Sequence, residues 1–354
     1  MHNKHPFSIL VFMLSFWFSQ CVHASKNPAP VLAKIHFNTQ TADFSAARNF
    51  YRLLGYTDGV GNFPKTNTPL MAKSLGMYDL CTYVLDEIEV INMPHVKTSN
   101  AIDLIKFKVP FNPEPPYAAL NHLGMIYAAF SSADIEQDYA YLEGNGVPFL
   151  SPLRGDTGNR FAFFRDPDGV FYKLQESDDK SATATPPHLT QMAYVAFNVS
   201  NIEASLKFYQ DVGYEQIGEG TTHLLDASTA LAYGFDDPIK FSTLEIKATQ
   251  GDQHRIKLIQ WHSHFDPEPP YPAPISHIGI HRIALAVADL DASVNYLSEK
   301  GVGFLSEPAP CCSGTGLDKQ GIINAIDPDG IFVELVGAIE QRKPQPLPKH
   351  CQSQ

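Results

Sequence analysis

The chain has 354 residues, of which 44% are hydrophobic and 18% are charged, and its formal net charge is −12. This composition is typical of a globular protein and excludes a largely disordered chain. The acidic excess argues against a nucleic-acid partner and against docking on anionic lipid, because both require a basic surface.

The first 24 residues have the pattern of a secretory signal peptide. Lys4 precedes the uncharged run FSILVFMLSFWF, and the small residues Val22 and Ala24 lie three and one before Ser25. The run is short for a membrane span, so cleavage is expected after Ala24. A lipoprotein beginning at Cys21 and an uncleaved anchor are the alternatives. Cleavage predicts a secreted or periplasmic protein with no other membrane segment.

Four cysteines follow the signal peptide: Cys81, Cys311, Cys312 and Cys351. An exported protein can oxidise them. The neighbours Cys311 and Cys312 seldom bond each other because the geometry is strained, so one of them could pair with Cys351. Free thiols are the other interpretation, and the sequence leaves the choice open.

A long repeat organises the chain. FNPEPPY at 111–117 returns as FDPEPPY at 265–271, and both copies lead to a DPDG motif, in FFRDPDGVFYKL and NAIDPDGIFVEL. The preceding segments FNTQTADFSAARNFYRLLGY (37–56) and VAFNVSNIEASLKFYQDVGY (195–214) also match. The second half is therefore a duplicate of the first, and the stiff Pro-rich heptads are connectors at equivalent joints.

Each half contains two modules, and each module begins with a strand, then a helix opened by Asp or Asn, then further strands. The predicted fold class is α+β. The predicted organisation is a signal peptide (1–24), a first half (25–177) with module one (31–108) and module two (119–177), a linker (178–187), a second half (188–337) with module three (188–262) and module four (277–337), and a polar tail (338–354).

Four motifs carry a family resemblance: ADFSAARNFYRLLGY, SNIEASLKFYQDVGY, ADLDASVNYLSEKGVGF and the paired DPDG endings. With them the chain resembles the vicinal oxygen chelate superfamily, which includes lactoylglutathione lyase (glyoxalase), methylmalonyl-CoA epimerase, extradiol dioxygenases, and fosfomycin and bleomycin resistance proteins. The resemblance covers nearly all of the chain after the signal peptide. It implies four βαβββ modules that form two open curled-sheet barrels, and it implies no particular reaction, because this fold hosts many.

The resemblance also implies a divalent metal inside a barrel, held by the first and last strands of the contributing modules. Zn, Fe, Mn and Ni accept imidazole and carboxylate ligands. Counted from the helix-opening residues, from DPDG and from the apolar strand pattern, eight positions correspond to such ligands: His36 and Asp103, Tyr127 and Lys173, Tyr194 and Lys257, Arg282 and Glu334. Lys and Arg are cationic and repel a metal. The sequence therefore departs from the family pattern and favours a metal-free site.

The pairing of the modules decides which of these residues meet. The resemblance to extradiol dioxygenases implies one with two and three with four, which gives neither barrel three metal ligands. The resemblance to single-chain, four-module glyoxalases implies one with four and two with three, which gathers His36, Asp103 and Glu334 in one barrel. Arg282 would lie with them and could bind an anionic substrate. Without a metal, Arg282–Glu334 would be an ion pair and His36–Asp103 a structural hydrogen bond.

Three functions remain open. The first is an exported glyoxalase-like lyase, isomerase or ring-cleaving dioxygenase, with His36, Asp103 and Glu334 on the metal and with Arg282 or Tyr127 orienting the substrate. The second is a metal-free protein that binds or sequesters an anionic or aromatic small molecule, using Tyr127, Tyr194, Lys173 and Lys257. The third is a metal-free enzyme with Lys or Tyr as acid or base. Each implies a small-molecule partner and a monomer or homodimer.

Overall fold

The computed structural model describes most of the chain beyond the predicted signal peptide. The described residues are 26–61, 63, 68–96, 99–179, 185–252, 254–311, 319–340 and 349–351. The signal peptide and parts of the predicted linker and polar tail lie outside them. No helix in these ranges is long and apolar enough to cross a membrane.

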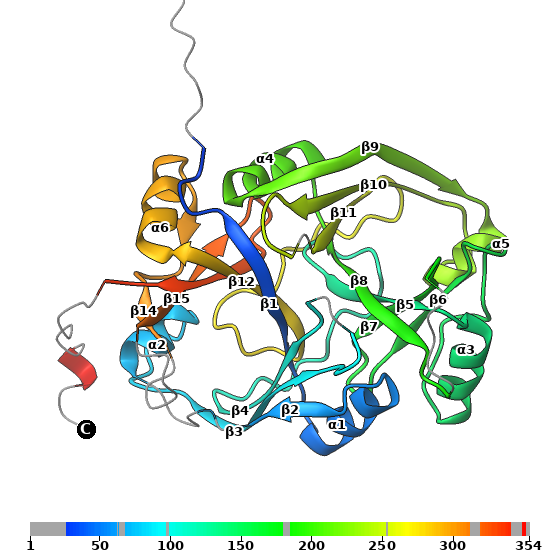
Figure 1. The fold of residues 1–354 in the computed structure, drawn as a ribbon, viewed down its shortest axis with the longest axis horizontal. Coiled ribbons are helices and arrows are strands. Elements are labelled where there is room, and N and C mark those ends of the chain that lie inside the picture. The colour runs from blue at the N-terminus through cyan, green and yellow to red at the C-terminus, as the bar shows by residue number, and fades with distance from the viewer. Residues whose placement is uncertain are drawn as a thin grey trace, which may run out of the picture.

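Two curled sheets lie side by side, with helices around their outside (Figure 1). Within the described residues the first sheet has nine strands in the order β13-β15-β16-β12-β1-β4-β3-β2, with β14 paired to β15. In chain order these are β1 (Val31–Gln40), β2 (Asp58–Val60), β3 (Val84–Asn92), β4 (Ile102–Val109), β12 (Gly279–Asp289), β13 (Gly303–Phe304), β14 (Ala309–Pro310), β15 (Gln320–Ile326) and β16 (Phe332–Ala338). The same modules supply α1 (Phe44–Leu53), α2 (Pro69–Ser74) and α6 (Leu290–Glu299).

The second sheet has seven strands in the described part of the chain, in the order β6-β7-β5-β8-β11-β10-β9. They are β5 (Ile126–Ser132), β6 (Phe161–Arg165), β7 (Phe171–Glu176), β8 (Leu189–Asn198), β9 (Tyr214–Leu225), β10 (Ile239–Ala248) and β11 (Arg255–Trp261). Its modules supply α3 (Ile135–Gly144), α4 (Ile202–Val212), α5 (Ala227–Ala230) and the 3₁₀ turn η1 (Leu231–Tyr233). A further 3₁₀ turn, η2 (Lys349–Cys351), lies in the tail.

The two sheets settle how the modules pair. Strand β1 runs antiparallel to β12, and β5 runs antiparallel to β8. Module one therefore shares a barrel with module four, and module two shares one with module three. The predicted α+β class with two open curled-sheet barrels is confirmed, and of the two pairings that the sequence left open the structure has the second.

Two modules depart from the predicted βαβββ order. Modules one and three have three strands after their first helix, whereas module four has four (β13 to β16) and module two has β6 and β7 alone among its described residues. In place of the expected strand there are two isolated bridges, at Phe149 and Arg154. Pro148 and Pro152 lie in this segment, and proline cannot donate a hydrogen bond to a neighbouring strand.

Side-chain caps begin the four main helices where the sequence predicts. Asp43, Asp134, Asn201 and Asp289 each accept a hydrogen bond from the backbone N–H three residues later, as N-cap residues do. In the two DPDG motifs the first aspartate also orders the backbone. Asp166 accepts from the N–H groups of 168 and 170, and Asp327 accepts from those of 329 and 331. These turns fix where β7 and β16 begin.

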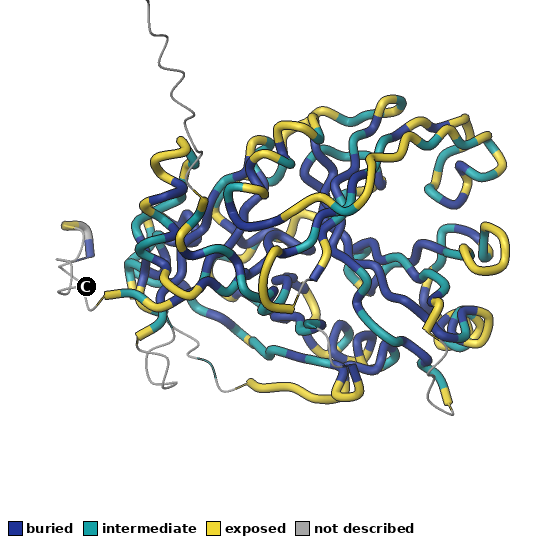
Figure 2. The backbone as a smooth tube through the Cα atoms, turned by 45° about the horizontal axis from the view of Figure 1, so that its top comes forward, coloured by how far each residue is buried: buried dark blue, intermediate teal, exposed yellow. Residues whose placement is uncertain are grey.

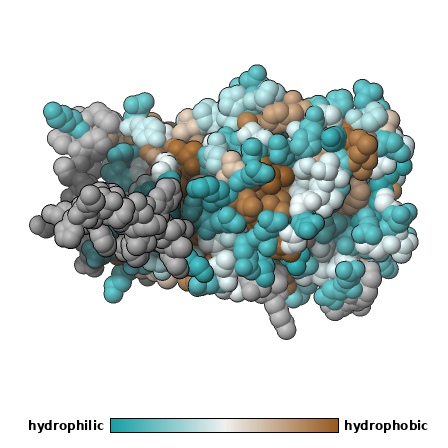
Figure 3. Space-filling model, turned by 90° about the horizontal axis from the view of Figure 1, so that it is seen from above, coloured by the Kyte–Doolittle hydropathy of each residue, from teal (hydrophilic) through white to brown (hydrophobic). Residues whose placement is uncertain are grey.

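A hydrophobic core joins the two barrels from outside. Helix α1 belongs to module one, yet Tyr51 shares a hydrogen bond of 2.6 Å with the hydroxyl of Tyr172 in module two, and Phe50 packs against Phe164. Buried residues follow the strands through the middle of the molecule, whereas β9 is largely exposed (Figure 2). The face seen from above is mostly hydrophilic, with apolar groups gathered near its centre (Figure 3).

The two heptads run between the barrels and pack on each other. The rings of Tyr117 and Tyr271 stack with centroids 4.2 Å apart. The Tyr117 hydroxyl accepts from the N–H of Tyr271 at 3.1 Å, and the Tyr271 hydroxyl donates to the carbonyl of Pro115 at 2.9 Å. Each ring also lies against a histidine at the entrance to the next module, His122 at 4.1 Å and His277 at 3.8 Å. The predicted connectors are thus a contact between the duplicated halves.

A disulfide links Cys81 to Cys351 in the tail, and Cys311 is also disulfide-bonded. Free thiols at these three positions are therefore the wrong interpretation. The predicted bond from Cys311 or Cys312 to Cys351 is also wrong, because Cys81 takes that place. Cys312 lies outside the described residues.

The contact between the heptads predicts a costly substitution at Gly124. This residue has φ +75°, and an added Cβ would lie 2.2 Å from the Cγ atom of Pro270. Gly146 has φ +83° and no atom within 4 Å of an added Cβ, so Gly146→Ala measures the backbone strain alone. We expect Gly124→Ala to cost about 1–3 kcal/mol more than Gly146→Ala, as overpacking does. Urea unfolding of both variants measures the difference, and equal costs would contradict this packing.

Candidate functional site

Each barrel encloses one cavity large enough for a small molecule. The first cavity, in the barrel of modules one and four, has a volume of about 530 Å³. The second cavity, in the barrel of modules two and three, has a volume of about 320 Å³. Both values lie in the range of ligand pockets, roughly 300–1,000 Å³. All eight sequence-predicted positions line these cavities: His36, Asp103, Arg282 and Glu334 the first, and Tyr127, Lys173, Tyr194 and Lys257 the second.

Strand register brings the four polar residues of the first cavity together. In the parallel pair β1–β4, Asn38 lies opposite Asp103, and in the parallel pair β12–β16, Ala284 lies opposite Glu334. The antiparallel pair β1–β12 then sets His36 opposite Ala284. His36 and Glu334 therefore meet only because modules one and four share a sheet.

Arg282 and Glu334 form a buried ion pair, in which the Arg282 Nε donates to the Glu334 carboxylate. The Arg282 Nη1 also lies 2.9 Å from the Nδ1 atom of His281. The side chains of Arg282 and Glu334 are 5% and 7% exposed. This is the ion pair that the metal-free interpretation predicts, and together with the His281 contact it uses two of the five N–H donors of the guanidinium.

His36 and Asp103 are linked through Asn38. The Asn38 Nδ2 donates to Asp103 at 2.9 Å, and the Asn38 Oδ1 lies 3.2 Å from the His36 Nδ1. The predicted direct His36–Asp103 hydrogen bond is therefore wrong. Sequence reasoning missed Asn38, although it lies two residues from His36 on the same face of β1. Burial raises the pKa of Asp103 and lowers the pKa of His36.

These residues do not fit a divalent metal as they stand. The Glu334 carboxylate is bound to Arg282, and Asn38 occupies one oxygen of Asp103. The guanidinium brings a positive charge to the place where the family pattern has a ligand, and it would repel a cation. Among the described residues, no group of three or more His, Cys, Asp or Glu side chains is arranged to hold a metal ion.

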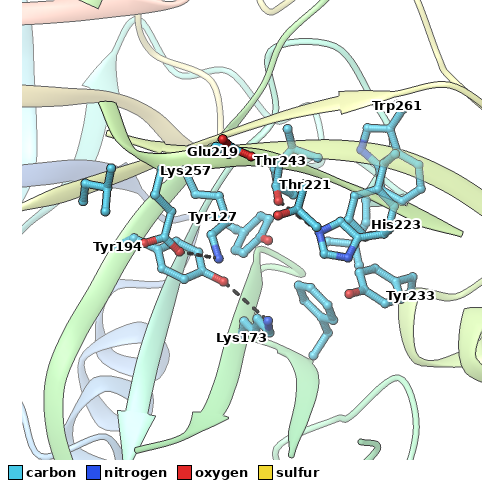
Figure 4. Close-up of a pocket in the computed structure, with 16 residues that line it drawn as sticks. Tyr127, Lys173, Tyr194, Glu219, Thr221, His223, Tyr233, Thr243, Lys257 and Trp261 are labelled. Atoms are coloured by element: carbon cyan, nitrogen blue, oxygen red, sulfur yellow. Dashed lines mark hydrogen bonds and ion pairs between the residues drawn. The ribbon is translucent and has the colours of Figure 1, made fainter. Parts of the chain in front are cut away.

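The second cavity presents two lysines among aromatic rings (Figure 4). The Lys257 Nζ lies 2.8 Å from a Glu245 oxygen and 4.0 Å from the centre of the Tyr194 ring. The Lys173 Nζ donates to the Tyr194 hydroxyl at 3.4 Å and lies 4.7 Å from the centre of the Phe161 ring. Lys257 is therefore paired with a carboxylate, whereas Lys173 directly contacts a tyrosine hydroxyl and aromatic rings.

The electrostatics of the second cavity follow from this difference. Burial first, and then repulsion from Lys257, lower the pKa of Lys173 to about 7, although Glu245 opposes the shift. Burial raises the pKa of Tyr127 and of Tyr194, so both hydroxyls stay protonated at neutral pH and can donate hydrogen bonds. Glu245 was missed from the sequence, and its place opposite Lys257 on the β10–β11 hairpin is the signal that could have found it.

Comparisons with known proteins agree with this architecture. The sequence model of the Glyoxalase/Bleomycin resistance protein/Dioxygenase superfamily matches residues 96–173 and 191–335. The uncharacterized protein YaeR of Escherichia coli (strain K12) is 40% identical over 72 residues, which are 20% of this chain and 54% of that protein. The chain thus spans about half the length of this relative.

Solved structures give the same result. Glyoxalase I from Zea mays is 17% identical, with a TM-score of 0.55 over 86% of this chain and 92% of that one. A putative dioxygenase from Bacillus subtilis is 11% identical, with a TM-score of 0.51 over 89% of this chain and 86% of that one. At these identities the likeness shows the fold alone.

The environment of Lys173 predicts that its removal stabilises the protein. The unfolded chain keeps Lys173 charged up to its ordinary pKa of 10.5, whereas the folded chain keeps it charged only up to about pH 7. The cost of burying the charge is therefore fully present below pH 7 and declines as the pH rises toward 10.5. Lys173→Met should raise the free energy of unfolding by about 1 kcal/mol or more, since one pKa unit is about 1.4 kcal/mol.

Urea unfolding at pH 6 and pH 9.5 measures this gain, which should be larger at pH 6. Lys240→Met is the matched control, because Lys240 is an exposed lysine on β10, and it should change stability little at either pH. A loss of stability in Lys173→Met at both pH values would contradict the interpretation.

Proposed function

This chain belongs to the Glyoxalase/Bleomycin resistance protein/Dioxygenase superfamily, and from that premise we propose that it binds a mostly apolar small molecule in its first cavity without a metal ion. One observation carries the proposal. The guanidinium of Arg282 occupies a position where the family pattern has a metal ligand, and it pairs with Glu334. Both residues line a cavity whose other walls are mostly apolar.

The walls of the first cavity favour an apolar ligand body. Apart from the polar group around Arg282 and Gln320, the lining side chains are almost all hydrophobic, including Met71, Leu85, Ile105, Phe107, Ile322 and Val336. Burying a ligand against such walls contributes about 25 cal/mol for each Å² removed from water. The ligand would thus obtain most of its affinity from the walls and its orientation from the polar floor.

The polar floor favours a neutral ligand head that donates a hydrogen bond. The Oδ1 atom of Asp103 is buried and has no hydrogen-bond partner among the described residues. The positive charge of Arg282 is compensated by Glu334, so an anionic head would face the two acidic side chains of the floor. The predicted role of Arg282 as an anchor for an anionic substrate therefore gains no support from this arrangement. A hydroxyl group fits the floor better than a carboxylate does.

A metal-dependent lyase, isomerase or dioxygenase would require a different arrangement. His36, Asp103 and Glu334 would have to turn toward one point, and Arg282 would have to leave its partner. Breaking a buried ion pair costs about 3–5 kcal/mol. That cost favours the binding function over the metal enzyme.

We also infer that the protein is exported and acts in the periplasm or outside the cell. The hydrophobic N-terminal run and the Cys81–Cys351 disulfide support this inference, because such bonds persist in oxidising compartments. N-terminal sequencing of protein from its own host should begin at Ser25, and retention of Met1 in the mature protein would refute cleavage.

Calorimetric titration with 1-octanol and octanoate tests the binding function. The two molecules share a chain and differ in the charge of the head, so octanol should bind at least about tenfold more tightly. Val90→Phe narrows the first cavity and should weaken octanol binding at least about tenfold. Ile217→Phe narrows the second cavity and should leave octanol binding unchanged. No octanol binding to the wild type, or equal effects of the two variants, would refute the assignment.

Metal analysis of the purified protein completes this test. We expect no stoichiometric divalent metal and no tight binding of added Zn²⁺, Fe²⁺, Mn²⁺ or Ni²⁺. Stoichiometric binding that Glu334→Gln abolishes would contradict the metal-free proposal and favour the enzyme.

A further inference from the structure

We propose that the second cavity is a separate binding site for a small aromatic carboxylate, held between Lys173 and Lys257. The inference concerns a different cavity from the one to which the binding function was assigned, and each can fail without the other. It rests on an uncompensated charge, on the shape of the cavity and on the chemistry of its walls.

The charge is that of Lys173. Among the described residues no carboxylate lies within ion-pair distance of its Nζ atom, and its polar contact is the Tyr194 hydroxyl at 3.4 Å. The side chain lines the cavity and keeps some accessible surface, so a ligand can reach it. A buried ammonium without a partner is unfavourable. An anion in the cavity would supply the missing partner.

In the described part of the chain, the neighbouring charges leave Lys173 without a carboxylate partner of its own. Lys257 also lines the cavity, and Glu245 is the carboxylate beside it. Glu245 is shared, because its other oxygen lies 3.3 Å from the Arg255 guanidinium. Glu219 also lines the cavity, but it is exposed on β9. The lining therefore holds two lysines and two glutamates, and among the described residues neither glutamate lies within ion-pair distance of the Lys173 Nζ atom.

The walls indicate what kind of anion fits. Tyr127, Phe163, Tyr194, Tyr233, Phe241 and Trp261 surround the cavity with rings, and Figure 4 shows Tyr233 and Trp261 on the side away from the lysines. Aromatic rings favour edge-to-face and offset-stacked contacts with another ring. A volume of about 320 Å³ suits one or two rings. A benzoate-like molecule can place its carboxylate at Lys173 and its ring among these side chains.

Binding of this anion should take up a proton. The carboxylate favours the charged form of Lys173, whose pKa of about 7 leaves it largely neutral at pH 8 without ligand. The other titratable groups around the cavity are Lys257, Glu245, Glu219, His223, Tyr127, Tyr194 and Tyr233. Burial raises the pKa of all three tyrosines and lowers the pKa of His223. These rings are therefore neutral near pH 8 with or without the anion.

Calorimetric titration with benzoate and with benzamide tests the proposal. The two molecules share a ring and differ in charge, so benzoate should bind at least about tenfold more tightly. Titrations at pH 8 in two buffers of different ionisation enthalpy should give an uptake close to one proton for each benzoate bound. Acetate and inorganic phosphate are the non-aromatic probes, and both should bind at least about tenfold more weakly than benzoate.

Variants show where benzoate binds and separate its affinity from the proton uptake by Lys173. Lys173→Met should weaken benzoate at least about tenfold and abolish the proton uptake, whereas Lys173→Arg should keep affinity without uptake, because arginine does not titrate in this range. Val90→Phe, which narrows the first cavity, should leave benzoate binding unchanged. Benzoate should also change the fluorescence of Trp261, and Trp261→Phe should remove that change.

Four results would overturn the proposal. Absence of benzoate binding to the wild type at millimolar concentration, or unchanged binding by Lys173→Met, would refute the carboxylate site. Equal affinity for benzamide would refute the role of charge. Phosphate or acetate binding as tightly as benzoate would refute the aromatic assignment and leave a site for small anions in general.

Discussion

Two antiparallel strand pairs hold the arrangement on which both cavities depend. β1 pairs with β12, and β5 pairs with β8, so each barrel takes one module from each duplicated half. Each half therefore supplies only part of each cavity, since the polar residues of each cavity are divided between the halves. The heptads make this exchange possible, because they carry the chain from one barrel to the other and stack on each other where they pass. The helices reinforce it from outside, as Tyr51 of module one does through Tyr172 of module two.

The low dielectric of the barrel interiors decides what the charged residues can do. Charges in such surroundings need a partner, and an unpaired one costs several times more than it would at the surface. The first barrel meets this requirement internally, with Arg282 against Glu334 and with Asn38 between His36 and Asp103. The second barrel meets it in part, since Lys257 has Glu245 as its ion-pair partner, whereas the hydrogen-bond partner of Lys173 is the uncharged Tyr194 hydroxyl. The paired charges of the first cavity agree with the proposed ligand, which gains its affinity from the apolar walls. Lys173 of the second cavity, which has no ion-pair partner among the described residues, agrees with the proposed charged ligand.

The helices, the turns and the positions that line the cavities could be predicted from local sequence. The pairing of the modules and the contacts between side chains depend on residues far apart in the chain. Helix caps such as Asp43 and the DPDG turns are set within a few residues, so the positions counted from them, such as Glu334, reach the cavities as expected. The pairing of modules is decided by strands far apart in the chain, and both pairings are compatible with the same local signals. The partner of Cys351 depends in the same way on the path of the tail. Asn38 and Glu245 escaped notice for another reason, because counting ligand positions ignores the residues that sit beside them on the same face.

The duplication allows the two cavities to be compared position by position, and at two matched positions the residues have opposite charge types. Module one corresponds to module three and module two to module four, so Asp103 corresponds to Lys257 and Glu334 to Lys173. Both acidic positions of the first cavity are thus lysines in the second. At the remaining two positions, His36 and Arg282 are matched by tyrosines. Loss of a metal site would require only that ligands disappear, and uncharged residues would then be the simplest replacement. Lysine at both acidic positions replaces two carboxylates by two amines, which can pair with an anion where the carboxylates of the first cavity would repel it. The ligands proposed for the two barrels differ accordingly, a neutral hydroxyl compound in the first and an aromatic carboxylate in the second, and the same backbone positions set the difference.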